Sequence, residues 1–326
     1  MRVLVGAFGD PGHAFPAIAL ARALHERGHA VCVQTWERWR EGVEAEGITF
    51  AAAPEYHVFP TRERPLKPYE AVTRATVDTR PLIREWAPDV VVADILTLAP
   101  ALAAERGLLV DMHCDESDDP LSRHVETLTF ETQRLGLQGR VTGSHLTSMH
   151  SMDNYYVSKL LPLMAEAQVH VVANPLINIT LQGRHDSYPK RRGMTRVPEL
   201  MAHGVNVAFG QDCAMDPWYS LGSGDMLEVA HMGLHVGQMT SQTAMRQCFE
   251  AVTTNAAKVM QLKGYGLEAG CNADFVLLQA RDVIEAIRLR ATRLKVFKRG
   301  KLLAECPPAT SRLTLPGRPA STSWIA

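Results

Sequence analysis

Eight short runs rich in β-branched residues, each followed by a turn and a helical pattern, constrain what this chain folds into. This rhythm is typical of parallel βα units. The predicted strands cover residues 3–8, 30–35, 48–53, 90–93, 108–112, 140–144, 169–173 and 205–210. Eight such units agree with a closed (β/α)8 barrel, but the same rhythm also builds open doubly wound sheets. Counting strands therefore leaves both arrangements open.

The pattern changes after Asp212, where the chain no longer alternates between strand and helix. Apolar periodicity predicts helices over residues 226–239 and 244–261. Short strands are predicted over residues 273–278, 293–298 and 301–305, with a turn at Gly300. The sequence thus predicts a small β appendage at the carboxyl end. Residues 54–68 are rich in proline and charge, which predicts a long surface loop or lid.

Composition excludes several classes of partner and compartment. The formal net charge of -1 provides no electrostatic footprint for nucleic acid or for an anionic membrane. The six cysteines contain no CxxC pair, which argues against a zinc ribbon and indicates a reducing compartment. The first residues read as a strand rather than a leader, and no run of about 18 apolar residues occurs. We therefore expect a cytoplasmic protein.

Polar residues lie at the ends of the last four predicted strands: His113, His145, Asn174 and Asp212. Ligands of parallel α/β folds bind at the carboxyl ends of strands, so these side chains are predicted to converge on one mouth. Histidine and aspartate are suitable ligands for a divalent metal. One histidine at a strand end is commonly a surface residue, and Asn174-Pro175 also suits an ordinary turn. Four coincident strand ends favour a functional site.

Two further assignments follow from these positions. Glu116 lies three residues beyond His113, close enough along the chain to face the same cavity and carry a proton. His145 is placed to hold or polarise an attacking water, whose pKa a bound metal lowers towards neutrality.

The run Lys190-Arg191-Arg192 is compatible with an anionic ligand and also with a solvated loop.

From about residue 108 to its end, the chain resembles the carboxyl-terminal part of bacterial cytosine deaminases, members of the amidohydrolase superfamily. The strings that carry this resemblance include VDMHCDESDD, SHLTSMHS, VANPLINITLQGR, YPKRRGMTRV, DPWYSLGSGDML and HMGLHVGQ. The resemblance implies that His113 is a metal ligand, Glu116 the proton shuttle, and His145 the residue that acts on the hydrolytic water. It implies that Asp212 is a metal ligand and proton acceptor, and Trp218 a wall of the pyrimidine pocket. The implied cofactor is divalent iron or zinc.

Two departures from that family's pattern stand out. Some members carry His-Asp-Asp on the last strand, whereas this chain has Gln211-Asp212-Cys213, so Cys213 replaces an aspartate that contacts the substrate ring. We expect Asn174, Cys213 and Trp218 to contact a small pyrimidine-like substrate. The family also carries a His-x-His pair that supplies two metal ligands on the first strand, and the first 106 residues contain none. The implied metal site is therefore incomplete in this sequence.

The front of the chain resembles a different family. The string VLVGAFGDPGHAFPAIALARALHERGHAV, followed later by PDVVVADILTLAPALAAERG, is similar to the amino-terminal domain of GT-B glycosyltransferases. The resemblance implies an acceptor-binding domain in which His13 is a general base. A loop histidine that caps backbone groups beside a helix is an equal alternative for His13. Gly6, Gly9 and Gly12 form a loose turn of the phosphate-binding type, which is weak support for a nucleotide.

Together these observations predict an α/β fold in which Rossmann-like parallel βα units join the last four βα units of a (β/α)8 amidohydrolase barrel. The predicted parts are residues 1–106, a half barrel over 107–270, and a partial β-sandwich over 271–326. The leading hypothesis is hydrolytic deamination of cytosine or a related cyclic amidine. The alternatives are a glycosyltransferase-like acceptor-binding protein and a catalytically inactive chimera. A half barrel exposes strand edges and apolar surface, which favours a homo-oligomer.

Overall fold

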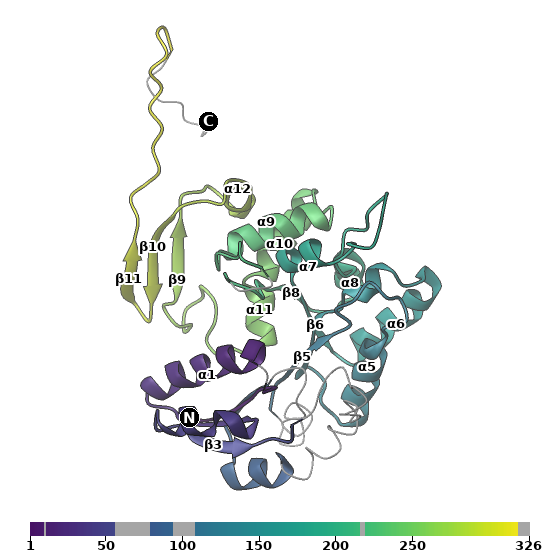
Figure 1. Ribbon diagram of the computed structural model, residues 1–326. Coiled ribbons are helices and arrows are strands. Elements are labelled where there is room, and N and C mark those ends of the chain that lie inside the picture. The colour runs from purple at the N-terminus through teal and green to yellow at the C-terminus, as the bar shows by residue number, and fades with distance from the viewer. Residues whose placement is uncertain (10, 56–78, 94–107, 216–218, 319–326) are drawn as a thin grey trace. The chain divides into compact units, whose positions relative to one another are not determined.

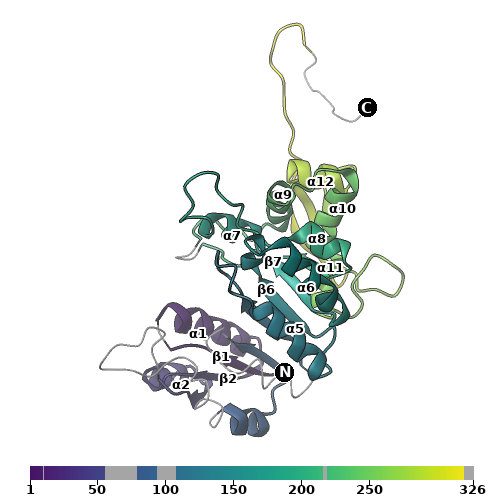
Figure 2. The same ribbon diagram turned by 90° about the vertical axis from the view of Figure 1, so that its right-hand side faces the viewer.

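A computed structural model of the chain describes residues 1–9, 11–55, 79–93, 108–215 and 219–318. The chain folds into two compact units. Unit 1 comprises Met1–Cys114, Val125–Ser144 and Glu166–Val169, and unit 2 comprises Asp115–His124, His145–Ala165 and His170–Ala326. Figures 1 and 2 show the helices and strands of each unit. Most of the loop predicted over 54–68 lies outside the described residues.

A four-stranded parallel sheet forms the first part of unit 1 (Figure 1). Its strands are β1 (Arg2–Gly6), β2 (Ala30–Thr35), β3 (Thr49–Ala52) and β4 (Val90–Ala93), in the order β3-β2-β1-β4. The intervening helical elements are α1 (Pro11–Glu26), η1 (Glu37–Trp39) and α2 (Arg40–Glu44).

Both faces of this sheet are covered, because successive side chains of a strand point to opposite sides. Val3 and Val5 belong to a core that includes Ala21 of α1 and Val43 of α2. Leu4 belongs to a second core with Cys32 and Ile83. Burial on both faces accounts for the unbroken apolar run of the first strand, the pattern expected of a parallel sheet.

Unit 1 also holds β5 (Val110–Cys114) and nearly all of β6 (Val141–His145), which are neighbouring strands. Helix α5 (His124–Arg134) connects them in sequence, and Val110, Leu137 and Val141 form a small core there. Strands β4 and β5 belong to different sheets. Among the described strands, the eight predicted units therefore do not form one closed barrel.

Unit 2 continues the parallel pattern and then becomes helical. Strands β7 (His170–Ala173) and β8 (Val207–Phe209) pair in parallel. The helical elements between β6 and β8 are η2 (Thr147–His150), α6 (Asn154–Glu166), α7 (Pro175–Leu181) and α8 (Val197–Ala202). After β8 come α9 (Met226–Val236), α10 (Gln242–Ala251) and α11 (Thr254–Val259).

Local sequence explains where these later helices begin and end. Asp225 caps α9 by accepting hydrogen bonds from the backbone N–H groups of Leu227 and Glu228. Ser241 caps α10 in the same way through the N–H of Ala244. The single helix predicted over 244–261 is wrong, because Thr253 has φ -131° and ψ -94°, outside the helical region, and separates α10 from α11.

The predicted β appendage is present as an antiparallel sheet in the order β11-β10-β9 (Figure 1). Its strands are β9 (Phe275–Leu278), β10 (Arg293–Lys298) and β11 (Lys301–Glu305). Gly300 has φ 74° in the tight turn between β10 and β11, a conformation that glycine adopts at little cost. Helix α12 (Val283–Leu289), which the sequence analysis did not predict, connects β9 to β10. None of the described helices has the length and apolar character needed to cross a bilayer.

Thiol reactivity at pH 8 is expected to separate the six free cysteines into two classes. Burial raises the pKa of Cys32 to about 11 and that of Cys248 to about 12, so both stay protonated at that pH. Cys306 is exposed. We expect a thiol reagent to modify Cys306 within minutes and to leave Cys32 and Cys248 unmodified, as read by peptide mass spectrometry. Labelling in urea, where every thiol is accessible, is the control; modification of Cys248 in the folded chain would contradict its burial.

Candidate active site

His145 is the buried centre of a polar cluster in unit 2. Its side chain has no exposed surface, although it ends β6 and is followed by a loop. The amide nitrogen Nδ2 of Asn178 donates to His145 Nδ1 at 2.9 Å, and Nδ2 of Asn174 lies 3.3 Å from the same atom. An amide N–H can only donate, so Nδ1 is an acceptor and the proton of the neutral ring lies on Nε2.

Two carboxylates lie beside this imidazole, one at each ring nitrogen. Oε1 of Glu116 is 3.4 Å from Nδ1, and Oδ1 of Asp212 is 3.8 Å from Nε2. Their side chains are 31% and 17% exposed, whereas the ring is fully buried. A small molecule can therefore reach both carboxylates while the histidine stays in a fixed orientation.

Backbone conformation marks the same positions. Asp115, His145 and Asp212 have φ values of 54°, 72° and 63°, in the left-handed region that disfavours residues with a Cβ. Each costs of the order of 1 kcal/mol or more. Such conformations persist only where surrounding contacts hold them, and they concentrate at functional sites. Asp115 directly follows β5, His145 is the last residue of β6, and Asp212 lies in the segment after β8, which ends at Phe209.

Asp115 holds the loop that carries Glu116. Its carboxylate is fully buried and accepts hydrogen bonds from Ser122 Oγ at 2.9 Å and from the backbone N–H of His124 at 2.9 Å. Nδ1 of His124 lies 2.8 Å from the same oxygen. The carbonyl of Asp115 also accepts from Ser148 N–H and Thr147 Oγ, both at 3.0 Å. The Glu116 loop is thereby tied to η2, which begins two residues after His145.

In the segment after β8, the backbone at Gly210 lies close to Asn174, and a buried side-chain oxygen of Gln211 lacks a hydrogen-bond donor within the described residues. A Cβ on Gly210 would lie 2.3 Å from Asn174 Oδ1, so this position requires glycine. Cys213 Sγ donates to Asp212 Oδ2 at 3.4 Å. Oε1 of Gln211 is buried and has no hydrogen-bond partner in the described part of the chain. This buried acceptor, next to Asp212 in the sequence, is short of a hydrogen-bond donor.

The structure assigns the predicted site residues to different places. Glu116, His145, Asn174, Asp212 and Cys213 all belong to unit 2, where the first four have the positions given above. His113 belongs to unit 1 and is the fourth residue of β5, which extends two residues beyond its predicted end. Trp218 lies outside the described residues.

His13 and Asn178 are the two positions at which the sequence reading differs most from the structure. His13 lies in the first turn of α1, with its ring edge-on to Phe8 at 5.8 Å, so the prediction of a loop histidine is wrong. Asn178 is not among the predicted site residues, yet it makes the short contact to His145. Its i, i+4 spacing from Asn174 is the signal that pairs the two amides on one helix face.

Comparison with known proteins points to one family over most of the chain. An amidohydrolase family model matches residues 9–304. The pterin deaminase of Rhizobium rhizogenes is 31% identical over 210 residues, which cover 63% of this chain and 47% of that protein. The L-demethylnoviosyl transferase of Streptomyces niveus is 32% identical over 157 residues, covering 42% of this chain and 41% of the transferase. The chain thus spans about half the length of these relatives or less.

A solved structure adds to this comparison. The 5-methylcytosine deaminase of Klebsiella pneumoniae, crystallised with 5-fluorocytosine, superimposes with a TM-score of 0.68 and 32% identity. The superposition covers 92% of this chain and 76% of that protein.

Proposed function

The chain belongs to the amidohydrolase family, and from this premise we propose that it hydrolytically deaminates a small nitrogen heterocycle of the cytosine type. The observation that carries the proposal is the buried His145 ring with Glu116 and Asp212 at its two nitrogens. Two proteins to which the chain is similar are named as deaminases of such heterocycles, one of a pterin and the other of 5-methylcytosine.

We further propose that His113 and Asp212 are ligands of a divalent iron or zinc ion, in a site for which residues 1–106 supply no His-x-His pair. Neutral imidazole nitrogen and carboxylate oxygen are the ligands that these ions take in proteins, and both residues offer one. The buried acceptor Gln211 Oε1 beside Asp212 fits a hydrated or amine-bearing group there. When bound, such an ion lowers the pKa of a water towards neutrality.

In the proposed reaction, Glu116 transfers the proton and His145 positions the attacking water. Water oxygen forms a bond to the ring carbon that bears the amine, and the carbon–nitrogen bond then breaks to release ammonia. Glu116 takes a proton from the water and delivers it to the departing nitrogen, which balances the hydrolysis. His145 donates its Nε2–H to the attacking oxygen, because Asn178 keeps Nδ1 as the acceptor.

Substrate selection is proposed to lie with the residues around Asp212. Gln211 Oε1 accepts a ring or amine N–H, and Asn174 contributes polar contacts from the start of α7. Cys213 is a poorer hydrogen-bond partner than the aspartate that some amidohydrolases carry at this position. We therefore expect the preferred heterocycle to differ from cytosine in the group that meets Cys213.

Ammonia release is the direct test. Purified protein loaded with ferrous iron or zinc is offered cytosine, 5-methylcytosine, isocytosine and a pterin, and ammonia and metal content are measured together. One equivalent of bound metal with turnover of at least one heterocycle supports the proposal. Stoichiometric metal with no release of ammonia from any of them contradicts the reaction class. Absence of bound metal contradicts the metal site.

Asn178 is expected to act through the orientation of His145. Asn178→Ala removes the N–H that fixes the ring tautomer, and we expect kcat to fall about 10- to 100-fold with little change in metal content, as for other second-layer partners. Thr180→Val, on the same helix but bonded to the Leu176 carbonyl, is the matched control. Equal kcat for Asn178→Ala and wild type would remove Asn178 from the mechanism.

We also propose a separate role in glycosyl transfer or acceptor binding for residues 1–106. This part is distinct from the half barrel of residues 107–270 and the tail of residues 271–326. The open sheet order β3-β2-β1-β4 and the 32% identity to a glycosyl transferase favour it. His13 would be the base in this case. Stabilisation of the wild type, but not of His13→Ala, by a nucleotide sugar in a thermal-shift assay would support it; no shift for either would contradict it.

A further inference from the structure

Unit 2 contains a cavity of about 410 Å³ that is separate from the residues of the candidate active site. Its walls come from three segments of the chain: His150 of η2, residues 191, 192, 194–196, 198 and 199 around the start of α8, and residues 236–238 at the end of α9. His145, Glu116, Asp212 and Gln211 do not line it.

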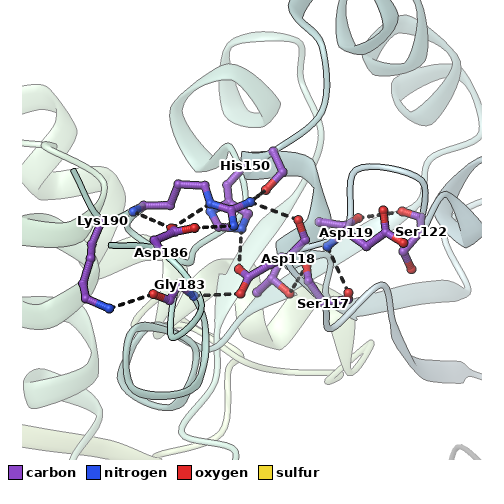
Figure 3. Close-up of polar contacts among 12 residues, drawn as sticks. Ser117, Asp118, Asp119, Ser122, His150, Gly183, Asp186 and Lys190 are labelled. Carbon is purple, nitrogen blue, oxygen red and sulfur yellow. Dashed lines mark hydrogen bonds and ion pairs between the residues drawn. The ribbon is translucent and has the colours of Figure 1, made fainter. Parts of the chain in front are cut away.

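One wall of this cavity carries a buried nitrogen atom that lacks a partner. The His150 side chain is only 8% exposed, and its Nε2 lies 2.9 Å from Asp118 Oδ1 (Figure 3). Nδ1 of the same ring is buried and makes no hydrogen bond within the described residues. His150 lines the cavity, so a ligand bound there is a source of the hydrogen bond that Nδ1 lacks.

The contacts around His150 indicate whether its Nδ1 needs a hydrogen-bond donor or an acceptor. The backbone N–H of Gly183 donates to Asp118 Oδ2 at 2.8 Å (Figure 3). The other carboxylate oxygen, Oδ1, can only accept, so His150 Nε2–H is the donor of the contact between them. Burial lowers the pKa of His150, and the Arg191 charge adds to this effect, whereas Asp118 and Asp186 oppose it. The ring is therefore neutral near pH 7, and Nδ1 presents a lone pair that needs a hydrogen-bond donor.

The cations at the cavity differ in how fully they are paired. Arg191 forms a two-point ion pair with Asp186 (2.7 and 2.8 Å). Arg196 lies 3.3 Å from Glu199 and donates to Asn154 and to two backbone carbonyls. Arg192 donates only to the Val236 carbonyl, at 3.3 Å, and no carboxylate among the described residues lies within ion-pair distance of it. Its remaining N–H groups are available to an anion.

We propose that this cavity binds an oxyanion that also carries an O–H group, of which hydrogen phosphate is the simplest. Arg192 donates to the charged oxygens, and the O–H of the ligand donates to His150 Nδ1. Asp118 keeps the imidazole oriented with its lone pair towards the ligand. The combination of a cation and a buried acceptor selects against sulfate, which has the same shape and charge but no proton to donate near pH 7.

Titration calorimetry of the 326-residue chain with inorganic phosphate and with sulfate at pH 7.5 tests this site. We expect phosphate to bind at least about tenfold more tightly than sulfate. Arg192→Gln removes a charge-assisted hydrogen bond and is expected to weaken phosphate binding about tenfold or more. Arg246→Gln, an exposed arginine on α10 outside the cavity, is the matched control and should bind phosphate like the wild type.

Two further variants localise the effect. Asp212→Asn should keep the phosphate affinity of the wild type, because Asp212 lies outside the cavity. His150→Leu should lose the preference for phosphate over sulfate; if it fails to fold, the wild-type comparison and Arg192→Gln still decide. Equal affinity for phosphate and sulfate, an unchanged Arg192→Gln, or loss of binding in Asp212→Asn would each overturn the proposal.

Discussion

Glu116→Gln is expected to lower kcat for deamination by about 10²- to 10⁴-fold, the range that a positioned acid–base group contributes. Glutamine keeps the size and hydrogen-bonding shape of the side chain but can neither take a proton from water nor give one to the leaving nitrogen. Glu116 Oε1 lies 3.4 Å from His145 Nδ1, and the glutamine side chain should take nearly the same position. We therefore expect KM and metal content to stay near their wild-type values, which steady-state kinetics and metal analysis will measure.

Glu250→Gln provides the control for this experiment. Glu250 is an exposed glutamate on α10, and its replacement changes the net charge in the same way. Its kcat should equal that of the wild type. A Glu116→Gln enzyme that retains more than about a tenth of wild-type kcat would show that another group carries the proton.

Asp115→Ala is expected to destabilise the fold by roughly 2–4 kcal/mol, because the backbone and side-chain donors of Ser122 and His124 lose a buried, charged acceptor. The loop that carries Glu116 loses its attachment, so kcat should fall at least about tenfold as well. Urea denaturation followed by circular dichroism measures the first effect and ammonia release the second.

Two further variants distinguish the role of Asp115 from a general effect of losing an aspartate. Asp115→Asn keeps an oxygen that accepts from the His124 backbone N–H and should recover part of the stability. Asp119→Asn, in the same loop but exposed, should cost less than about 0.5 kcal/mol. If Asp115→Ala and Asp119→Asn unfold at the same urea concentration, Asp115 does not anchor the loop.

Secondary structure was predictable where the hydrophobic pattern was strong. Residues 30–35, 90–93, 293–298 and 301–305 have the predicted strand bounds. The division of the eight strands between sheets was not predictable, since a βα rhythm is the same in an open sheet and in a barrel. The break at Thr253 lacks glycine and proline and therefore left no signal in the sequence.

The candidate site was predictable as a set of strand ends but not as a geometry. His145 at the end of β6, and Asn174 and Asp212 after β7 and β8, were identified from position alone, and the latter two both lie beside His145. Asp115 was overlooked because a carboxylate that holds a loop has no periodic or spacing signature. The orphaned nitrogen of His150 likewise depends on contacts between segments far apart in the chain.

The left-handed residues at Asp115, His145 and Asp212 have a consequence for engineering this chain. Glycine would relieve the backbone at each position, but it would also remove the contacts of a buried or partly buried side chain, so the local strain cannot be removed without losing those contacts. The same replacements delete the anchor, the imidazole and the carboxylate of the site. Libraries for a more robust enzyme should therefore keep these three codons fixed and seek gains elsewhere, where robustness and turnover do not compete.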